Sequence, residues 1–146
     1  MHPSRTSLVL IVTHDPVLTG TATRALVALG FEVTDAIDHR SALEQIRQRV
    51  PQFVCVDLSL PRESGFELCE DLRAIPDYAA VQILVLSERW TAIDLAAAEE
   101  AGANAFVRKP VDGAHLAHYM RSMLERRHPS RPDFRELRPS DLPAAM

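Results

Sequence analysis

Three runs of consecutive apolar residues stand out along the chain, and none of them alternates apolar with polar positions. They are residues 8–12, 53–56 and 83–86. Strands that are apolar on both faces are typical of a parallel sheet that helices cover on both sides. We therefore predict three central strands here. Two less apolar segments, residues 31–36 and 105–107, are predicted as further strands, the first of them at an edge of the sheet.

Helical patterns fill the intervals between these strands. Asp15 and Pro16 provide a cap and a first turn for one helix. Ser41 and Glu44 have the spacing of a capping box, which would open another helix. Helices are predicted at residues 16–29, 41–49, 66–74, 91–101 and 112–127. The order is strand then helix, five times over, which predicts a doubly wound α/β fold with right-handed crossovers.

The pattern changes at residue 128. Residues 128–146 contain four prolines and show neither helical nor strand periodicity. We therefore predict one domain at residues 1–127 and a Pro-rich, mostly disordered tail at residues 128–146, in which residues 133–137 are the candidate for a short helical turn. The sequence leaves open whether this tail is a tether, a strand that docks on a partner, or inert.

Composition excludes several classes of protein. Sixteen basic against twenty acidic side chains give a net charge of −4, whereas nucleic-acid binders usually carry a basic surplus. The two cysteines, Cys55 and Cys69, have neither the number nor the spacing of a zinc site or a disulfide framework, which favours a reducing cytosol. Residues 8–12 are too few for a signal peptide or a membrane span. We expect a cytoplasmic protein with no direct nucleic-acid or membrane partner.

Three chemically useful side chains follow the apolar runs. Asp57 and Ser87 come directly after two of the central strands, and Lys109, the only lysine among sixteen basic residues, comes just after the last predicted strand. In an open parallel sheet, ligands bind beyond the carboxyl ends of the strands. A carboxylate there can attack phosphorus and form an acyl phosphate, while a hydroxyl and an ammonium group hold the anionic oxygens. The three residues together suit a phosphoryl group.

At these positions the sequence resembles the receiver domain of two-component response regulators, the CheY-like family. The resemblance covers residues 7–127 and rests on three motifs, which are FVCVDLSLPRESGFEL at residues 53–68, ILVLS at 83–87 and GANAFVRKP at 102–110. It implies a flavodoxin-like fold, in which a five-stranded parallel sheet of order 2-1-3-4-5 is flanked by five helices. It also implies a signalling protein rather than an enzyme.

The resemblance implies a role for each residue that matches a motif. Asp57 would be the phospho-acceptor, Ser87 the switch hydroxyl, Phe106 the switch aromatic residue and Lys109 the catalytic cation. The bond between Lys109 and Pro110 would be cis. The phosphoryl group would come from a histidine kinase or a phosphotransfer protein, and the output would pass to a downstream protein partner, because no second domain is visible in the sequence.

The sequence departs from the family pattern at the metal site. Receivers normally end the first strand with two acidic residues that help to hold Mg²⁺, but here these positions are Thr13 and His14. Asp57 and the backbone carbonyl of Ser59 remain as metal ligands, so Mg²⁺, the cofactor expected from the family, should bind weakly or not at all. Asp15 is interpreted as a helix cap rather than a ligand. His14 should face solvent or bond to Asp57, and a transition-metal site at His14, Asp57 and Asp15 is the disfavoured alternative.

Two functions therefore stay open. One is a single-domain receiver that is phosphorylated on Asp57, and the other is a pseudo-receiver that binds proteins without phosphorylation. A small α/β enzyme is disfavoured, because the sequence has no Gly-rich phosphate loop and no nucleophile elbow. The resemblance places the partner face, and a homodimer contact, on the fourth helix, fifth strand and fifth helix, and its candidates are Trp90, Phe106, His115 and Tyr119. Core packing is the better interpretation for Ile93 and Val111.

Overall fold

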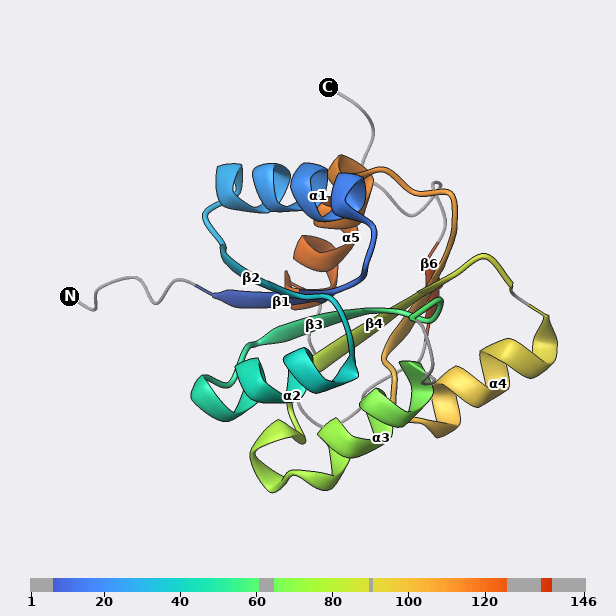
Figure 1. Ribbon diagram of the computed structural model, residues 1–146. Helices are drawn as coiled ribbons and strands as arrows, with labels where there is room; N and C mark the ends of the chain where they lie inside the picture. The colour runs from blue at the N-terminus through green and yellow to red at the C-terminus, as the bar shows by residue number, and fades with distance from the viewer. Residues whose placement is uncertain (1–6, 61–64, 90, 126–134, 138–146) are drawn as a thin grey trace.

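A computed structural model describes residues 7–60, 65–89, 91–125 and 135–137. A parallel sheet forms the middle layer, and helices cover both of its faces (Figure 1). Helices α1 (Pro16–Ala28) and α5 (Gly113–Glu125) lie on one face. Helices α2 (His39–Gln48), α3 (Gly65–Ala74) and α4 (Ala92–Glu100) lie on the other, with a short 3₁₀ helix, η1 (Pro76–Tyr78), after α3. This is the predicted three-layer α/β architecture.

All strand pairs in the sheet are parallel. The strands are β1 (Leu8–Val12), β2 (Glu32–Ala36), β3 (Phe53–Asp57), β4 (Gln82–Ser87), β5 (Ala105–Arg108) and β6 (Arg135–Leu137). Their order across the sheet is β2-β1-β3-β4-β5-β6. The predicted order 2-1-3-4-5 is confirmed, and a sixth strand is added beside β5.

The sixth strand corrects the prediction for residues 133–137. Residues 135–137 form neither a disordered segment nor a helical turn, but pair in parallel with β5. The reason is tertiary. The outer edge of β5 offers backbone groups that a passing segment can pair with, and this outweighs a weak local preference. The rest of the predicted tail, residues 128–134 and 138–146, lies outside the described residues.

Local signals start the helices, although one of them belongs to a different residue than predicted. Asp15 caps α1 as predicted, because its Oδ1 accepts hydrogen bonds from the backbone N–H groups of Val17 and Leu18. Helix α2 begins two residues earlier than predicted. Asp38 is its N-cap, and Ser41 is the third helical residue, whose side chain completes the capping box. The prediction that Ser41 is the N-cap residue of this capping box is therefore wrong.

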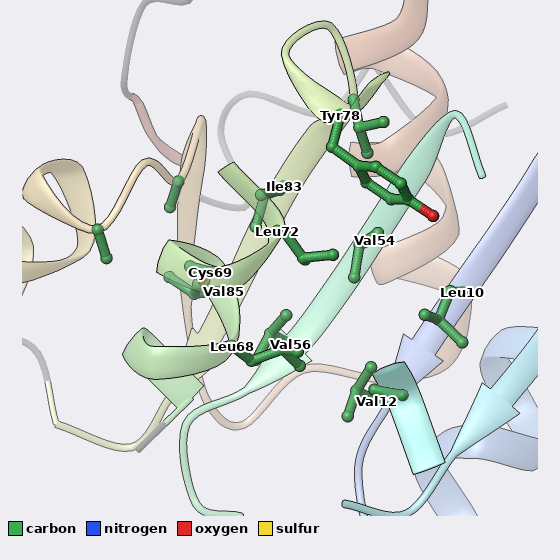
Figure 2. Packing of buried hydrophobic residues seen from close by; sticks show 14 of the residues in the cluster. Leu10, Val12, Val54, Val56, Leu68, Cys69, Leu72, Tyr78, Ile83 and Val85 are labelled. Carbon is green, nitrogen blue, oxygen red and sulfur yellow. The ribbon is translucent and has the colours of Figure 1, made fainter. Parts of the chain in front are cut away.

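Two apolar clusters, one on each face of the sheet, explain why the strands do not alternate. Successive residues of β1, β3 and β4 point to opposite faces, and both faces are buried. The cluster towards α2, α3 and α4 is seen in Figure 2, where its strand residues include Leu10, Val12, Val54, Val56, Ile83 and Val85. The cluster towards α1 and α5 takes the alternate residues Val9, Ile11, Phe53, Cys55, Leu84 and Leu86.

Candidate functional site

The three residues of the predicted site come from the carboxyl ends of three neighbouring strands. Asp57 ends β3, Ser87 ends β4, and Lys109 follows β5 directly. Strands β3 and β4 pair Asp57 with Leu86, so the two strands end at nearly the same level. The backbone N–H of Lys109 donates to the carbonyl oxygen of Ser87 over 2.8 Å, which joins the ends of β4 and β5.

Four donors surround the carboxylate of Asp57, a residue that is only 1% exposed. Its Oδ2 accepts hydrogen bonds from Lys109 Nζ at 2.7 Å and from Thr13 Oγ1 at 2.8 Å. Its Oδ1 accepts from the backbone N–H of Ser59 at 3.0 Å and from Ser59 Oγ at 2.7 Å. Burial of a charge is costly unless it is paired and hydrogen-bonded, and here both oxygens meet that condition.

The pKa of Asp57 reflects a contest between burial and these donors. Burial raises the pKa of the carboxyl group, but the hydrogen bonds from Lys109, Ser59 and Thr13 together outweigh it and hold the pKa below its ordinary value. Hydrogen bonds to the charged form of an acid favour that form. Asp57 is therefore an anion at neutral pH, which is the form a nucleophilic carboxylate needs.

Thr13 is the site residue that sequence reasoning missed. From sequence it counts only as a lost metal ligand, yet its buried hydroxyl donates to Asp57 and accepts from the backbone N–H of Asp15 at 3.1 Å. The signal that places it there is the pairing of β1 with β3, in which Val12 lies opposite Val56. The residue after Val12 must then lie beside the residue after Val56, which is Asp57.

The two predicted switch residues are both turned inward. Ser87 is 9% exposed, and its Oγ accepts a hydrogen bond from the backbone N–H of Arg89 at 3.0 Å. Among the described residues, no hydrogen bond joins the Ser87 side chain to Asp57. Phe106 is fully buried in the cluster that faces α2, α3 and α4. The peptide bond between Lys109 and Pro110 is cis, as the resemblance implied.

The residues at this edge do not fit Mg²⁺. That ion requires several oxygen ligands in near-octahedral geometry. His14 is exposed, and the carboxylate of Asp15 serves as the α1 cap. Both oxygens of Asp57 already accept from proton donors, one of them an ammonium group. Within the described ranges, no group of three His, Cys, Asp or Glu side chains is placed to hold a metal ion.

The residues of the predicted partner face are only partly at the surface. Trp90 lies outside the described residues. Phe106 and Tyr119 are 0% and 3% exposed, so neither is available for contact in this structure. His115 is exposed and contacts Asp112, with 2.8 Å between its Nδ1 and the Asp112 Oδ2.

The expectation of core packing is wrong for Ile93. This side chain is 80% exposed, because the buried face of α4 is centred on Ala98, and a residue five positions away points well off that face. For Val111 the expectation is confirmed, because its half-buried side chain packs against the cluster that faces α1 and α5. No helix in the described part of the chain is long and apolar enough to cross a membrane.

Comparisons with known proteins identify relatives of this chain. The family model for the response regulator receiver domain matches residues 9–121. The transcriptional regulatory protein CseB of Streptomyces avermitilis is 38% identical over 136 residues, which are 92% of this chain and 57% of that protein. The response regulator MprA of Mycolicibacterium vanbaalenii is 34% identical over 121 residues, 83% of this chain and 52% of that one. The chain thus spans about half the length of these relatives.

Two solved structures share the fold of this chain. A putative response regulator from Chloroflexus aurantiacus superimposes with a TM-score of 0.75 at 30% identity, over 84% of this chain and all of that one. The chemotaxis response regulator CheY4 of Vibrio cholerae shares the fold, with a TM-score of 0.76 at 23% identity over 81% of this chain and 98% of that one. The family model covers most of the chain, and the chain belongs to the response regulator receiver domain family, whose members are signalling domains rather than enzymes.

Proposed function

We propose that this receiver acts in a phosphorelay, in which Asp57 accepts a phosphoryl group from the phosphohistidine of a histidine kinase or a phosphotransfer protein. The observation that carries this proposal is the contact between Asp57 and Lys109, an ionised carboxylate and an ammonium group 2.7 Å apart at the carboxyl edge of the sheet. In the transfer, an oxygen of Asp57 attacks phosphorus, the P–N bond to the donor histidine breaks, and the histidine imidazole leaves with the electron pair and takes up a proton.

The surrounding residues would hold the product. The ammonium group of Lys109 can move from the carboxylate to the new phosphoryl oxygens, because charge-assisted hydrogen bonds to such oxygens are strong. The hydroxyl of Ser87, at the end of the neighbouring strand, can donate to another phosphoryl oxygen once it turns from Arg89. The hydroxyl groups of Thr13 and Ser59 already point at the carboxylate and need no metal ion to do so.

The charges around Asp57 lead us to expect slow transfer of the phosphoryl group to it. A phosphoryl group brings roughly two negative charges, and a bound metal ion would normally offset part of them. Here the cation in contact with Asp57 is Lys109, and the acidic pair that holds Mg²⁺ in other receivers is replaced by Thr13 and His14. We therefore propose that Asp57 accepts phosphate slowly and with little response to Mg²⁺.

A specific observation also favours the second function, a pseudo-receiver. The four hydrogen bonds to Asp57 satisfy the carboxylate without metal or phosphate, and they tie the end of β1 to the ends of β3 and β5. A domain held in this way can present one surface permanently to a protein partner. In both cases the output would pass to a downstream protein, since an overall charge of −4 does not favour direct contact with nucleic acid.

Phosphorylation with acetyl phosphate separates the two functions. The protein is incubated with and without Mg²⁺, and its intact mass is measured beside that of Asp57→Asn. A gain of one phosphate that is absent in Asp57→Asn and nearly the same with and without Mg²⁺ supports the proposed acceptor. A gain that requires Mg²⁺ contradicts the metal-independent site. No gain under either condition leaves the pseudo-receiver as the function.

A further inference from the structure

Strand β6 adds to the sheet from outside the part of the chain that matches the receiver family. The family model ends at residue 121, whereas β6 is formed by Arg135–Leu137. It pairs in parallel with β5, so that Phe106 lies opposite Glu136 and Val107 opposite Leu137. Figure 1 shows β6 at the end of the sheet, on the far side of β5 from β4.

We propose that β6 is an intramolecular cover, which closes the edge of β5 and keeps it from pairing with a second copy of this chain. The cover is a part of the same polypeptide, and it pairs with β5 at residues 105–107, before Lys109. The inference therefore does not rest on phosphorylation, and its test uses protein that has not been phosphorylated.

The edge of β5 needs such a cover because of what it would otherwise expose. An edge strand presents a row of unpaired N–H and C=O groups, on which another strand can pair. The side chains of Phe106 and Val107 are 0% and 2% exposed, so this strand is apolar on both faces. The charged residue of β5, Arg108, stands at its end, so residues 105–107, which pair with β6, carry no charge that would blunt an open edge.

Leu137 closes a second, apolar surface beside that edge. A groove of about 1000 Å³ lies between α1, α5 and the paired strands β5 and β6, and its lining includes Val107, Tyr119 and Leu137. Leu137 is 6% exposed and packs in the cluster that faces α1 and α5. Release of β6 would therefore uncover backbone groups and apolar side chains at the same place.

The cover is short enough to be released. It pairs through three residues, and Leu137 is the buried apolar residue among them. Segments with few buried apolar contacts open locally at a lower free energy than the core. When β6 leaves, the β5 edges of two copies can pair antiparallel across a two-fold axis, because such an interface uses the same surface on both subunits.

Two full-length variants test the cover, and one variant serves as a control. Leu137→Glu removes the buried anchor, and Glu136→Pro removes a backbone N–H from the strand while keeping Leu137. Val50→Glu makes the same kind of change at a site that is 47% exposed and lies between α2 and β3, neither of which pairs with β6. Hydrogen exchange at the backbone amides of β5 reports on the edge, because alternate N–H groups of this strand point towards β6. Sedimentation velocity over a range of concentrations reports on self-association.

The proposal predicts different exchange rates in β5 and different oligomeric states for the variants. The wild-type protein and Val50→Glu stay monomeric with slow exchange in β5, whereas the two β6 variants exchange about tenfold faster there and dimerise as concentration rises. A peptide of residues 133–141, Asp-Phe-Arg-Glu-Leu-Arg-Pro-Ser-Asp, added to Leu137→Glu should restore both the monomer and the slow exchange. The same peptide with Glu in place of its Leu should not.

Three outcomes would overturn the proposal. The first is that the β6 variants remain monomeric with unchanged exchange in β5. The second is a dimer of Leu137→Glu that the peptide does not dissociate, because that dimer would not use the β5 edge. The third is a wild-type dimer with β5 protected, which would mean that β6 exchanges between copies. If Leu137→Glu fails to fold, as circular dichroism would show, Glu136→Pro decides.

Discussion

The hydroxyl group of Thr13 donates a hydrogen bond of 2.8 Å to Oδ2 of Asp57, across two neighbouring strands and 44 positions of sequence. Both residues are buried, at 2% and 1% exposure. A proton donor thus lies directly beside this buried carboxylate. The carboxylate of Asp57 is stabilised by hydroxyl, amide and ammonium donors that belong to the chain itself, so its charge does not depend on a metal ion.

Replacing Thr13 with Val should destabilise the protein and raise the pKa of Asp57. The variant keeps a branched side chain but removes one donor from a buried carboxylate and one acceptor from the backbone N–H of Asp15. Losing such a hydrogen bond costs about 1–3 kcal/mol in the free energy of unfolding. Urea denaturation at pH 7 measures the cost. Thr13→Ser keeps the hydroxyl and should lose less than half as much, and equal losses in the two variants would show that packing rather than the hydrogen bond matters.

Placing two acidic residues at positions 13 and 14 should create a site that binds Mg²⁺. In the double variant Thr13→Asp/His14→Asp, one new carboxylate replaces the Thr13 hydroxyl beside Asp57 and the second follows at the next position, with Lys109 as the nearby cation. Without metal, like charges at short range should lower the thermal midpoint below that of the wild type. Mg²⁺ at millimolar concentration should restore it, since hard oxygen ligands suit this ion.

His14→Asp alone is the matched control for that experiment, because His14 is exposed and Thr13 keeps its bond to Asp57. Its thermal midpoint should respond to Mg²⁺ no more than the wild type does. A strong stabilisation of the wild-type protein by Mg²⁺, but not by Na⁺ at equal ionic strength, would show that the natural donor set does hold the ion.

The stability of the protein should fall in acid in a way that depends on Asp57. Its pKa is lower in the folded state than in the unfolded chain, where it is about 3.9. The unfolded state therefore binds the proton first, and the stability that the carboxylate contributes is complete above the unfolded pKa and is lost as pH falls through the folded pKa.

Asp57→Asn isolates this contribution, because Asn has no charge to titrate. Between pH 7 and pH 3 the urea midpoint of the wild type should fall by more than that of Asp57→Asn. Parallel curves for the two proteins would mean that the pKa of Asp57 is the same in the folded and unfolded states. The comparison cancels the titration of the other carboxyl groups, which the two proteins share.

The sheet is predictable from sequence because its central strands are continuous apolar runs flanked by helix signals. Asp57, Ser87 and Lys109 are predictable for a related reason, since the carboxyl ends of parallel strands meet at one edge. Strand β6 is not predictable from sequence. Residues 135–137, Arg-Glu-Leu, include one apolar residue, and their pairing depends on an edge formed by residues far earlier in the chain.

The role of Thr13 is hidden for a different reason. A threonine at the end of a strand is compatible with solvent exposure, and only the register of β1 on β3 places its hydroxyl against Asp57. For Ile93, apolar character is a misleading sign of burial, because α4 buries little more than Ala98. In both cases the missing information is the relative placement of elements rather than the type of residue.

Two glycines with positive φ should differ sharply in their tolerance of alanine. A Cβ atom added at Gly30 (φ 96°) would meet no neighbouring atom within 4 Å, whereas one added at Gly102 (φ 100°) would lie 2.5 Å from Cγ of Arg73. Gly30→Ala should therefore cost only the backbone strain, about 1–2 kcal/mol. Gly102→Ala should cost more, because it also displaces the half-buried side chain of Arg73.

The displaced side chain is one that the fold depends on. Arg73 donates through Nε to the carbonyl of Gly102 at 2.8 Å, through Nη1 to the carbonyls of Tyr78 and Val81 at 2.8 and 2.7 Å, and through Nη2 to Oδ1 of Asn104 at 2.7 Å. Burial lowers the pKa of this guanidinium. It joins the end of α3 to the chain before β4 and to the loop before β5, so any shift of Arg73 should weaken several bonds at once.

A double-mutant cycle separates the two contributions, with urea denaturation as the measurement. In the background Arg73→Ala, the side chain that would clash with the Cβ atom at residue 102 is absent. Gly102→Ala should therefore cost no more in that background than Gly30→Ala costs in the wild-type protein. Residues in contact commonly show coupling of about 0.5–3 kcal/mol in such cycles. If Gly102→Ala is equally costly with and without Arg73, the strain at residue 102 lies in the backbone alone and the contact with Arg73 adds nothing.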